Sequence, residues 1–232
     1  MCPMGGFAVG EVGDAYAGCR ARIGALVIEL GGDQEGTRVP TCPEWSVHDV
    51  VAHLGGVVDD VLAGRLDGVA TDSWTRAQVD ARRGEPIAAL VQAWDAAAPA
   101  FEHLIDGTGA PGHQAVSDVE THEHDIRHAL GQPGARDSHA VRIALGFVAP
   151  ALVASAASRG IAVQLRTTDG ARFGSPDAAA IVTAEPFELL RALTGRRSAA
   201  QLVAMQWDGD ASRAVGAFTF GPFRPAADPI YE

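Results

Sequence analysis

The sequence contains no lysine and no asparagine, so all 18 of its basic residues are arginines. Schiff-base catalysis and P-loop phosphate binding both need a lysine, and the chain therefore excludes both. Cysteine is also scarce. Cys2, Cys19 and Cys42 are odd in number, widely separated and without CxxC spacing. This pattern is typical of a reducing compartment and not of a disulfide scaffold. Any thiol chemistry would therefore use a small-molecule thiol.

The chain also lacks the features that nucleic-acid and membrane partners require. Its formal net charge is −11, whereas nucleic acids and anionic lipid surfaces are bound by basic patches. Charges interrupt its apolar stretches before they reach the roughly 18–20 residues of a membrane span. The N-terminal segment MCPMGGFAVGEVGDAY has no basic region of the kind that opens a secretory signal. We therefore expect a cytoplasmic protein with neither partner.

The periodicity of the first two thirds of the chain is helical. Ser46 is a good N-cap candidate, and Asp49 stands three residues later, as in a weak capping box. We expect helices over about 8–31, from Ser46, from Pro86, over 114–130 and over 139–158, with a polar connection over 67–84.

The pattern changes after Gly160. The segment IAVQLRTTDGARFG predicts a hairpin around an Asp169-Gly170 turn. AAAIVTA predicts a strand, PFELLRALTG a short helix, and the remaining tail an extended segment on the surface. The sequence therefore predicts an α+β protein with a helical bundle over 1–158 and a smaller α+β domain over 159–232.

Histidines and acids are concentrated in one predicted helix, within SDVETHEHDIRHALG. Asp118/His122 and Glu120/His124 have i, i+4 spacing, so each pair could hold an ion on one helix face. The two pairs differ by about 200° around the helix, and only one can face the core. The apolar side of the helix favours the first pair; it consists of Val119, Ile126, Ala129 and Leu130. We therefore choose Asp118 and His122 as candidate ligands and expect the other pair to be solvated.

His53 is the third candidate ligand. It lies between Val50 and Val57 at helical spacing and so points toward the bundle interior. A core histidine that hydrogen-bonds a backbone carbonyl has the same pattern, and the spacing of His53, Asp118 and His122 matches no general zinc motif. The residues alone leave both interpretations open.

Two segments, TCPEWSVHDVVAHLGG and DVETHEHDIRHALG, resemble signatures of the mycothiol-dependent maleylpyruvate isomerase family. The first contains His53. In the second, an acid precedes a histidine by four residues and an aspartate follows it by three, which matches Asp118, His122 and Asp125. FELLRALTGRRS, followed by QWDGD, resembles the family's C-terminal α+β domain. The resemblance covers nearly the whole chain. It implies a DinB-like, metal-binding four-helix bundle with His53, Asp118 and His122 as the metal ligands.

One position departs from the family's pattern. The characterised isomerase has glutamate as its acidic ligand, whereas this chain has Asp118, which is one methylene shorter. DIRHALG and GRRS also resemble a broad branch of the family more closely than the isomerase itself. The resemblance therefore implies the metal-binding bundle and leaves the substrate open.

The resemblance also implies a divalent metal, with zinc preferred and nickel tolerated, and mycothiol as a thiol cosubstrate. Three protein ligands leave a position for an incoming thiol, which loses its proton near the cation. We therefore expect a thiol-dependent isomerase or S-transferase for a small electrophile, as a monomer or homodimer. Asp125 is a candidate for orienting an imidazole. Arg127, Arg196 and Arg197 are candidates for binding a carboxylate of the substrate or cofactor.

Two other functions remain open. A non-catalytic, metal-stabilised module that binds a small ligand or a protein would have a filled site without an accessible pocket. A metal-dependent hydrolase would activate water and need a general base, for which Asp125 and Glu123 are the candidates. Cys42 precedes the second predicted helix without a neighbouring base, and we interpret it as structural.

Overall fold

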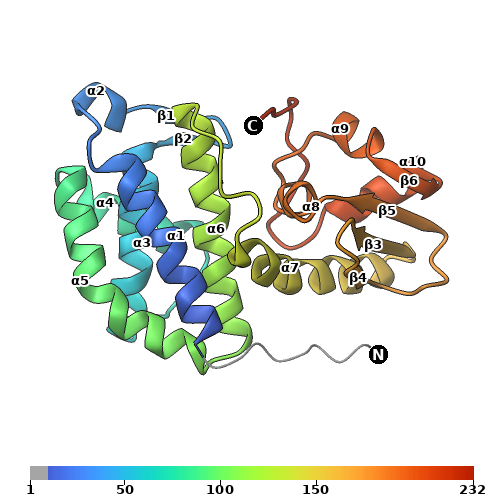
Figure 1. Ribbon diagram of the computed structural model, residues 1–232, viewed down its shortest axis with the longest axis horizontal. Helices are drawn as coiled ribbons and strands as arrows, with labels where there is room; N and C mark the ends of the chain where they lie inside the picture. Colours follow the sequence, from blue (N-terminus) through green and yellow to red (C-terminus); the bar gives the residue numbers. More distant parts are fainter. Residues whose placement is uncertain (1–9) are drawn as a thin grey trace. The chain divides into compact units, whose positions relative to one another are not determined.

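The computed structural model describes residues 10–232. Cys2 and the expected start of the first helix near residue 8 lie outside these residues. The chain divides into two compact units, Met1–Gly134 and Ala135–Glu232. Figure 1 shows the first unit as helical and the second as mixed helix and sheet.

Four helices of the first unit pack around one core (Figure 1). They are α1 (Glu11–Val27), α3 (Val47–Leu62), α5 (Ile87–Asp106) and α6 (Ala110–Leu130). α1 and α3 each contact both α5 and α6, as in a four-helix bundle. Tyr16 of α1 packs against Trp94 and Phe101 of α5, and all three side chains are buried. The expected four-helix core is confirmed.

The N-terminus of α3 has the predicted cap. Ser46 Oγ accepts a hydrogen bond from the Asp49 backbone N–H at 3.2 Å, and the Asp49 carboxylate accepts one from the Ser46 backbone N–H at 2.9 Å. This capping box fixes where the helix begins. Ser46 also ends β2 (Cys42–Ser46), which pairs antiparallel with β1 (Arg38–Val39). A single turn, α2 (Gly32–Glu35), precedes the two strands.

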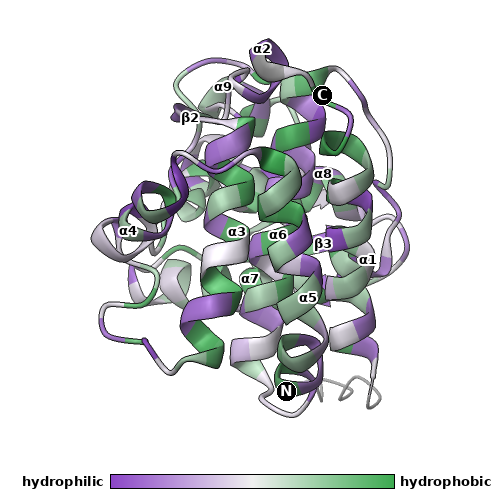
Figure 2. Ribbon diagram, turned by 90° about the vertical axis from the view of Figure 1, so that its left-hand side faces the viewer, coloured by the Kyte–Doolittle hydropathy of each residue, from purple (hydrophilic) through white to green (hydrophobic). Residues whose placement is uncertain are grey.

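The polar connection expected over 67–84 contains a helix, α4 (Asp72–Arg82), that the sequence analysis missed. Thr71 caps it by accepting a hydrogen bond from the Trp74 backbone N–H. Its buried residues, Gln78 and Val79, lie on the side that packs against α3. So narrow a buried face leaves little apolar periodicity to detect. Figure 2 accordingly shows α4 mostly in purple and white.

The second unit has a four-stranded sheet of order β4-β3-β5-β6. The strands are β3 (Val163–Thr167), β4 (Arg172–Phe173), β5 (Ala180–Ala184) and β6 (Gln206–Gly209). The two central strands are parallel, and each outer strand is antiparallel to its neighbour. The turn between β3 and β4 contains Asp169 and Gly170, with Gly170 at φ 102°, so the predicted hairpin is confirmed.

Helix α7 (His139–Ser158) has the expected bounds and packs against β3 and against α8 (Pro186–Leu193). Among the described residues, α7 is the one helix that is long and apolar enough to cross a membrane. The core helix of a folded domain has the same composition, and α7 contributes Val148 and Leu152 to the core of the second unit.

The boundary between the two units differs from the expected domain boundary at 158/159. Helix α7 was expected in the bundle, whereas the contacts place it in the unit Ala135–Glu232. Its apolar face packs with Leu165 and Leu190 of that unit. Helical periodicity shows that a face is buried but not which neighbour buries it.

The tail after β5 is more structured than expected. Besides β6 it contains α9 (Ala199–Val203), α10 (Ala211–Ala214) and a 3-10 turn, η1 (Val215–Phe218). Phe218 and Phe220 are buried, so the expectation of an extended surface tail is wrong for this part. These elements are each at most five residues long, too short to produce a periodic pattern.

We predict that Gly56 sets the approach of α4 to α3. A Cβ atom at Gly56 would lie 2.6 Å from Gln78 Cβ, so Gly56→Ala should force the helices apart and lower the free energy of unfolding by about 1–3 kcal/mol. Gly55→Ala is the matched control, because its Cβ would make an ordinary 3.7 Å contact with Trp94 Cβ and alanine favours helix. Urea denaturation compares the two variants, and equal stabilities would contradict this packing.

Candidate metal centre

Helix α3 presents His53 to the interior of the first unit, where its neighbours fix the orientation of its ring. His53 Nδ1 lies 2.8 Å from Gln78 Oε1, and Gln78 Nε2 donates to Asp60 Oδ2 at 2.8 Å. A carboxylate can only accept, so Asp60 fixes which end of the Gln78 amide faces His53. His53 Nδ1 must then donate to Gln78, and Nε2 points the other way, toward Asp118.

Helix α6 presents His122 and, three residues later, Asp125. His122 Nδ1 lies 3.1 Å from Asp125 Oδ2, and the Asp125 side chain is fully buried. A carboxylate on the far nitrogen of an imidazole is the usual arrangement behind a metal-ligating histidine, because it fixes the ring and its tautomer. The contact leaves His122 Nε2 directed toward Asp118.

The side chains of His53, Asp118 and His122 converge, as the sequence analysis expected of a metal site. Asp118 Oδ2 lies 3.3 Å from His53 Nε2, and Asp118 Oδ1 lies 3.7 Å from His122 Nε2. One ligand atom from each of the three lies within 4.8 Å of the others. The two histidines are buried, whereas the Asp118 side chain is 37% exposed. The cluster is therefore reachable from the side of Asp118.

These distances fit a bound cation. Two ligand atoms on a tetrahedral zinc ion, at about 2.0–2.1 Å each, are roughly 3.3 Å apart. The site also favours positive charge, because each imidazole has an acceptor oxygen on both sides: Gln78 and Asp118 for His53, and Asp125 and Asp118 for His122. A neutral imidazole has one N–H and can satisfy only one of its two acceptors.

The pKa of His53 also indicates that positive charge is favoured at this point. Burial disfavours its protonated form, but the charge and hydrogen bond of Asp118, together with the hydrogen bond of Gln78, outweigh burial and raise the pKa of His53. The surroundings thus favour a positive charge at this point. A divalent ion between the two Nε2 atoms and the Asp118 carboxylate would supply it.

Trp45 covers the two imidazoles. Its ring centroid lies 5.2 Å from that of His53 and 5.9 Å from that of His122, with an interplanar angle of 29° to the latter. The sequence analysis did not assign Trp45 a role, although TCPEWSVHDVVAHLGG contains it. Gln78 was missed as well, because it belongs to the undetected helix α4.

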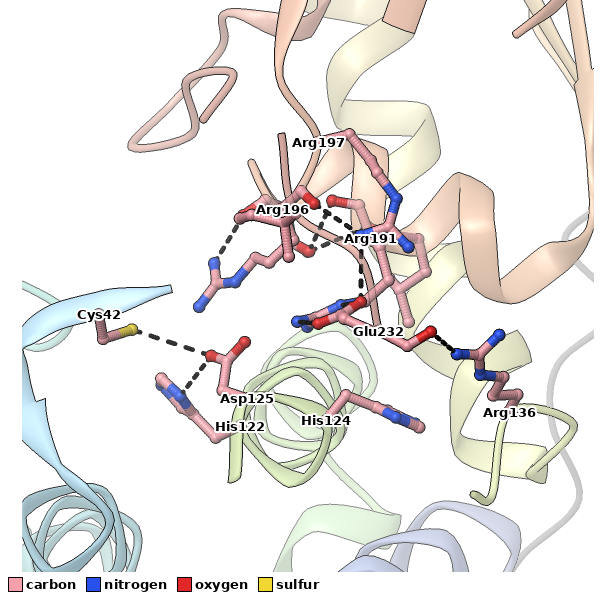
Figure 3. Close-up of polar contacts among 12 residues, drawn as sticks. Cys42, His122, His124, Asp125, Arg136, Arg191, Arg196, Arg197 and Glu232 are labelled. Carbon is pink, nitrogen blue, oxygen red and sulfur yellow. Dashed lines mark hydrogen bonds and ion pairs between the residues drawn. The ribbon is translucent and has the colours of Figure 1, made fainter. Parts of the chain in front are cut away.

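Cys42 also lies beside this cluster. Its Sγ is 3.8 Å from Asp125 Oδ2, and Cys42, His122 and Asp125 bring ligand atoms within 4.8 Å of one another (Figure 3). Cys42 was interpreted as structural because no base stands near it in the sequence. Strand β2, which carries both Cys42 and Trp45, contacts α3, and this tertiary contact has no signal in residue spacing.

The opposite face of α6 is buried too, so the expectation that Glu120 and His124 are solvated is wrong. Glu120 is fully buried, and its carboxylate lies 3.0 Å from His124 Nε2 and 3.1 Å from Cys19 Sγ. Helix α1 packs against this face and presents Cys19 and Arg22 to it. Helix α6 buries polar residues on a second side, and an amphipathic pattern, which assumes that polar residues face solvent, does not predict this.

Glu123 lies in the same polar cluster against α1. Arg22 donates to both of its carboxylate oxygens, and Arg127 donates to Oε1 at 2.9 Å. These ion pairs disfavour Glu123 as the residue that activates water, because two guanidinium groups already occupy the oxygens of its fully buried carboxylate. Arg127, expected to bind a substrate carboxylate, is held by a carboxylate of its own helix.

The other two arginine candidates, Arg196 and Arg197, belong to the second unit. Arg196 Nη1 donates to the Thr194 backbone oxygen at 2.6 Å. Arg197 binds the carboxylates of Glu188 and Glu232, and the buried Arg191, which the sequence analysis did not select, binds Glu232 as well. Figure 3 shows Arg191 and Arg197 around Glu232.

We predict different reactivities for the two described thiols. Burial, followed by the charges of Glu120 and Glu123, raises the pKa of Cys19 well above its ordinary value, and its side chain is fully buried. Cys42 is partly exposed. In a Cys2→Ser background at pH 8, iodoacetamide should modify Cys42 at least about tenfold faster than Cys19. Peptide mass spectrometry measures both rates, with a urea-unfolded sample as control; equal rates in the folded protein would refute the burial argument.

The comparisons with known proteins agree with the fold. Residues 16–127 match the family described as the mycothiol maleylpyruvate isomerase N-terminal domain. No curated protein matches the chain. The crystal structure of the mycothiol-dependent maleylpyruvate isomerase has the same fold, with a TM-score of 0.52 at 10% identity, over 82% of this chain and 90% of that one.

The structure of a mutant of that isomerase, in which one histidine is replaced by alanine, gives a TM-score of 0.53 at the same identity and coverage. At this identity the two structures bear on the fold alone, and the family assignment comes from the matched residues. The candidate ligands His53, Asp118 and His122 all lie within the matched range. Residues 16–127 therefore form a domain of the family described as the mycothiol maleylpyruvate isomerase N-terminal domain.

Proposed function

We propose that this protein is a metal-dependent enzyme that uses a small-molecule thiol to isomerise a small electrophile or to transfer the thiol to it. His53, Asp118 and His122 hold a divalent ion, with zinc as the first candidate and nickel as the second. Mycothiol is the thiol that the family suggests. Among the described residues, Cys19 and Cys42 form no disulfide, which is in keeping with a reducing, cytoplasmic environment.

One observation carries the proposal: two buried imidazoles direct their Nε2 atoms at the same carboxylate, while acceptors occupy their Nδ1 sides. A structural histidine usually needs one acceptor. Two histidines that share Asp118 and are each oriented from behind form the donor set of a metal site with two nitrogen ligands and one oxygen ligand.

The residues around the ligands have separate roles. Gln78 and Asp125 orient the two imidazoles, and Trp45 shields them from water. The exposed side of Asp118 leaves an approach for a ligand from solvent. A divalent ion held here would supply the positive charge that favours the thiolate form of an incoming thiol.

The contacts give less support to the two alternatives. Of the two candidate bases of a hydrolase, Glu123 is held by Arg22 and Arg127, and Asp125 accepts hydrogen bonds from His122 and Cys42. A non-catalytic, metal-stabilised module would have a closed site, whereas the acidic candidate ligand is more than a third exposed. Thiol-dependent chemistry needs no protein base once the thiol is ionised.

We predict about one divalent ion per chain in protein purified without a metal-affinity tag. His53→Ala and His122→Ala should each remove an imidazole ligand and lose the ion, whereas Asp118→Glu, which keeps a carboxylate, should retain it. Elemental analysis by plasma mass spectrometry gives the stoichiometry. His48→Gln and His128→Gln are matched controls on the same two helices. Loss of metal in these controls, or its retention in both alanine variants, would count against the site.

We predict that turnover of activated alkenes such as maleylpyruvate requires mycothiol as well as the metal. Removing either should lower the rate at least about 100-fold, and oxygen nucleophiles such as water should not replace the thiol. Product analysis by chromatography distinguishes isomer, thiol adduct and hydrolysis product. Metal-dependent turnover without thiol would favour the hydrolase, and a metal-loaded protein without any turnover would favour the binding module.

A further inference from the structure

The last nine residues of the second unit, 224–232, lie against the connection between α8 and α9. The Ala226 backbone N–H donates to the Arg197 backbone oxygen at 3.0 Å. Gln201 binds Ile230 twice, through its Nε2 to the Ile230 oxygen at 2.7 Å and through its Oε1 to the Ile230 N–H at 3.0 Å. We call this segment the C-terminal strap. It places the Glu232 side chain beside Arg191 and Arg197.

The arginine pair, Arg191 and Arg197, grips that side chain from two directions (Figure 3). Arg191 forms a forked pair of hydrogen bonds with both Glu232 oxygens, one of them from Nε to Oε2 at 2.9 Å. Arg197 Nη1 adds a third bond to Oε2 at 3.0 Å. The Arg191 side chain is fully buried, and that of Arg197 is 8% exposed. This is the geometry of a carboxylate receptor.

A second acid holds Arg197 in place independently of the strap. Glu188 accepts from Arg197 Nε and Nη2, both at 3.0 Å. Glu232 then adds a negative charge between the two arginines. Burial would raise the pKa of the Glu232 carboxyl, but the charges and hydrogen bonds of Arg191 and Arg197 lower it instead. Two nearby buried guanidinium groups are costly without such an anion.

A cavity of about 280 Å³ adjoins this arrangement. Glu188 lines the cavity and binds Arg197; Arg136 also lines it and donates to the Glu232 backbone oxygen. The Arg136 guanidinium lies over the Phe187 ring at 4.9 Å from its centroid, which adds an apolar wall. The volume is below that of most drug-sized ligand sites, so it suits a small molecule.

The charges of the cavity favour one class of anion. Two of its lining residues are arginines, Arg136 and Arg142, but four are acids: Asp137, Asp169, Glu185 and Glu188. Their repulsion disfavours a phosphate or sulfate dianion. A monocarboxylate brings one negative charge, matches the planar fork of Arg191, and can place a short apolar group against Phe187.

We propose that Arg191 and Arg197 form a binding site for a small monocarboxylate, and that Glu232 occupies this site as an internal competitor. Entry of the ligand displaces the Glu232 carboxylate from the two arginines. No covalent change is involved, and the ligand takes over the three hydrogen bonds that the Glu232 side chain accepts from Arg191 and Arg197.

The test is a titration with propionate, with propionamide as the neutral control, at constant ionic strength. The signal is the Arg191 Nε–H resonance in a proton–nitrogen NMR spectrum. Glu232→Ala removes the competitor, and its apparent dissociation constant for propionate should be at least about tenfold lower than that of the wild type. Adding Arg197→Met to Glu232→Ala should abolish saturation, whereas adding Asp208→Asn, which changes an exposed acid outside the cavity lining, should preserve it.

Glu232→Gln provides a second variant, should the alanine variant fold poorly. It keeps the shape of the side chain without its charge, and propionate should bind it more tightly than it binds the wild type. Absence of saturable binding in both Glu232 variants would overturn the proposal. So would an equal response to propionamide, tighter binding of sulfate or phosphate than of propionate, or propionate binding that survives Arg197→Met.

Discussion

The structure of the candidate site depends on one electrostatic constraint: two buried imidazoles share the carboxylate of Asp118, and each has a second acceptor behind it. The constraint extends outward, because Gln78 can face His53 in only one orientation while it donates to Asp60. The mostly polar helix α4 therefore has a structural role: it packs against α3 at Gly56 and so places Gln78 beside His53. A cation at the centre would satisfy every one of these contacts, which supports the proposed metal site.

Helix α6 combines this site with a second, chemically different cluster on its other side. Against α1, the fully buried carboxylates of Glu120 and Glu123 lie close to the guanidinium groups of Arg22 and Arg127, and Glu120 also contacts His124. Cys19, Glu120 and Glu123 could also hold a metal by distance. The guanidinium of Arg22, however, already lies 2.7 Å from Glu123 and 3.7 Å from Glu120. On one face of α6, arginine side chains therefore neutralise the buried acids. On the other face, the side chains of Asp118 and His122 point to a place where a cation would fit.

Much of this could be predicted from residue patterns, and the failures have specific physical causes. Ser46 and Asp49 marked the start of α3, and Asp169-Gly170 marked the hairpin, because caps and turns are local interactions. The prediction that His53, Asp118 and His122 lie together rested on the apolar faces of their helices and on the family resemblance. Glu120 was misplaced because α6 is buried on two sides, and helix α7 was assigned to the wrong unit because periodicity does not identify a packing partner. Cys42, Gln78 and the pairing of Arg191 with Glu232 depend on contacts between distant segments, which spacing does not encode.

The central claim is that the three converging side chains bind one metal ion directly. Anomalous diffraction from crystals of the protein, collected on both sides of the zinc absorption edge and of any other metal found, locates such an ion without assumptions. The account predicts one strong peak at about 2.0–2.2 Å from His53 Nε2, from His122 Nε2 and from an Asp118 oxygen. Metal-replete crystals with no peak there, or with the ion on the Nδ1 side of His122 between Asp125 and Cys42, would contradict it.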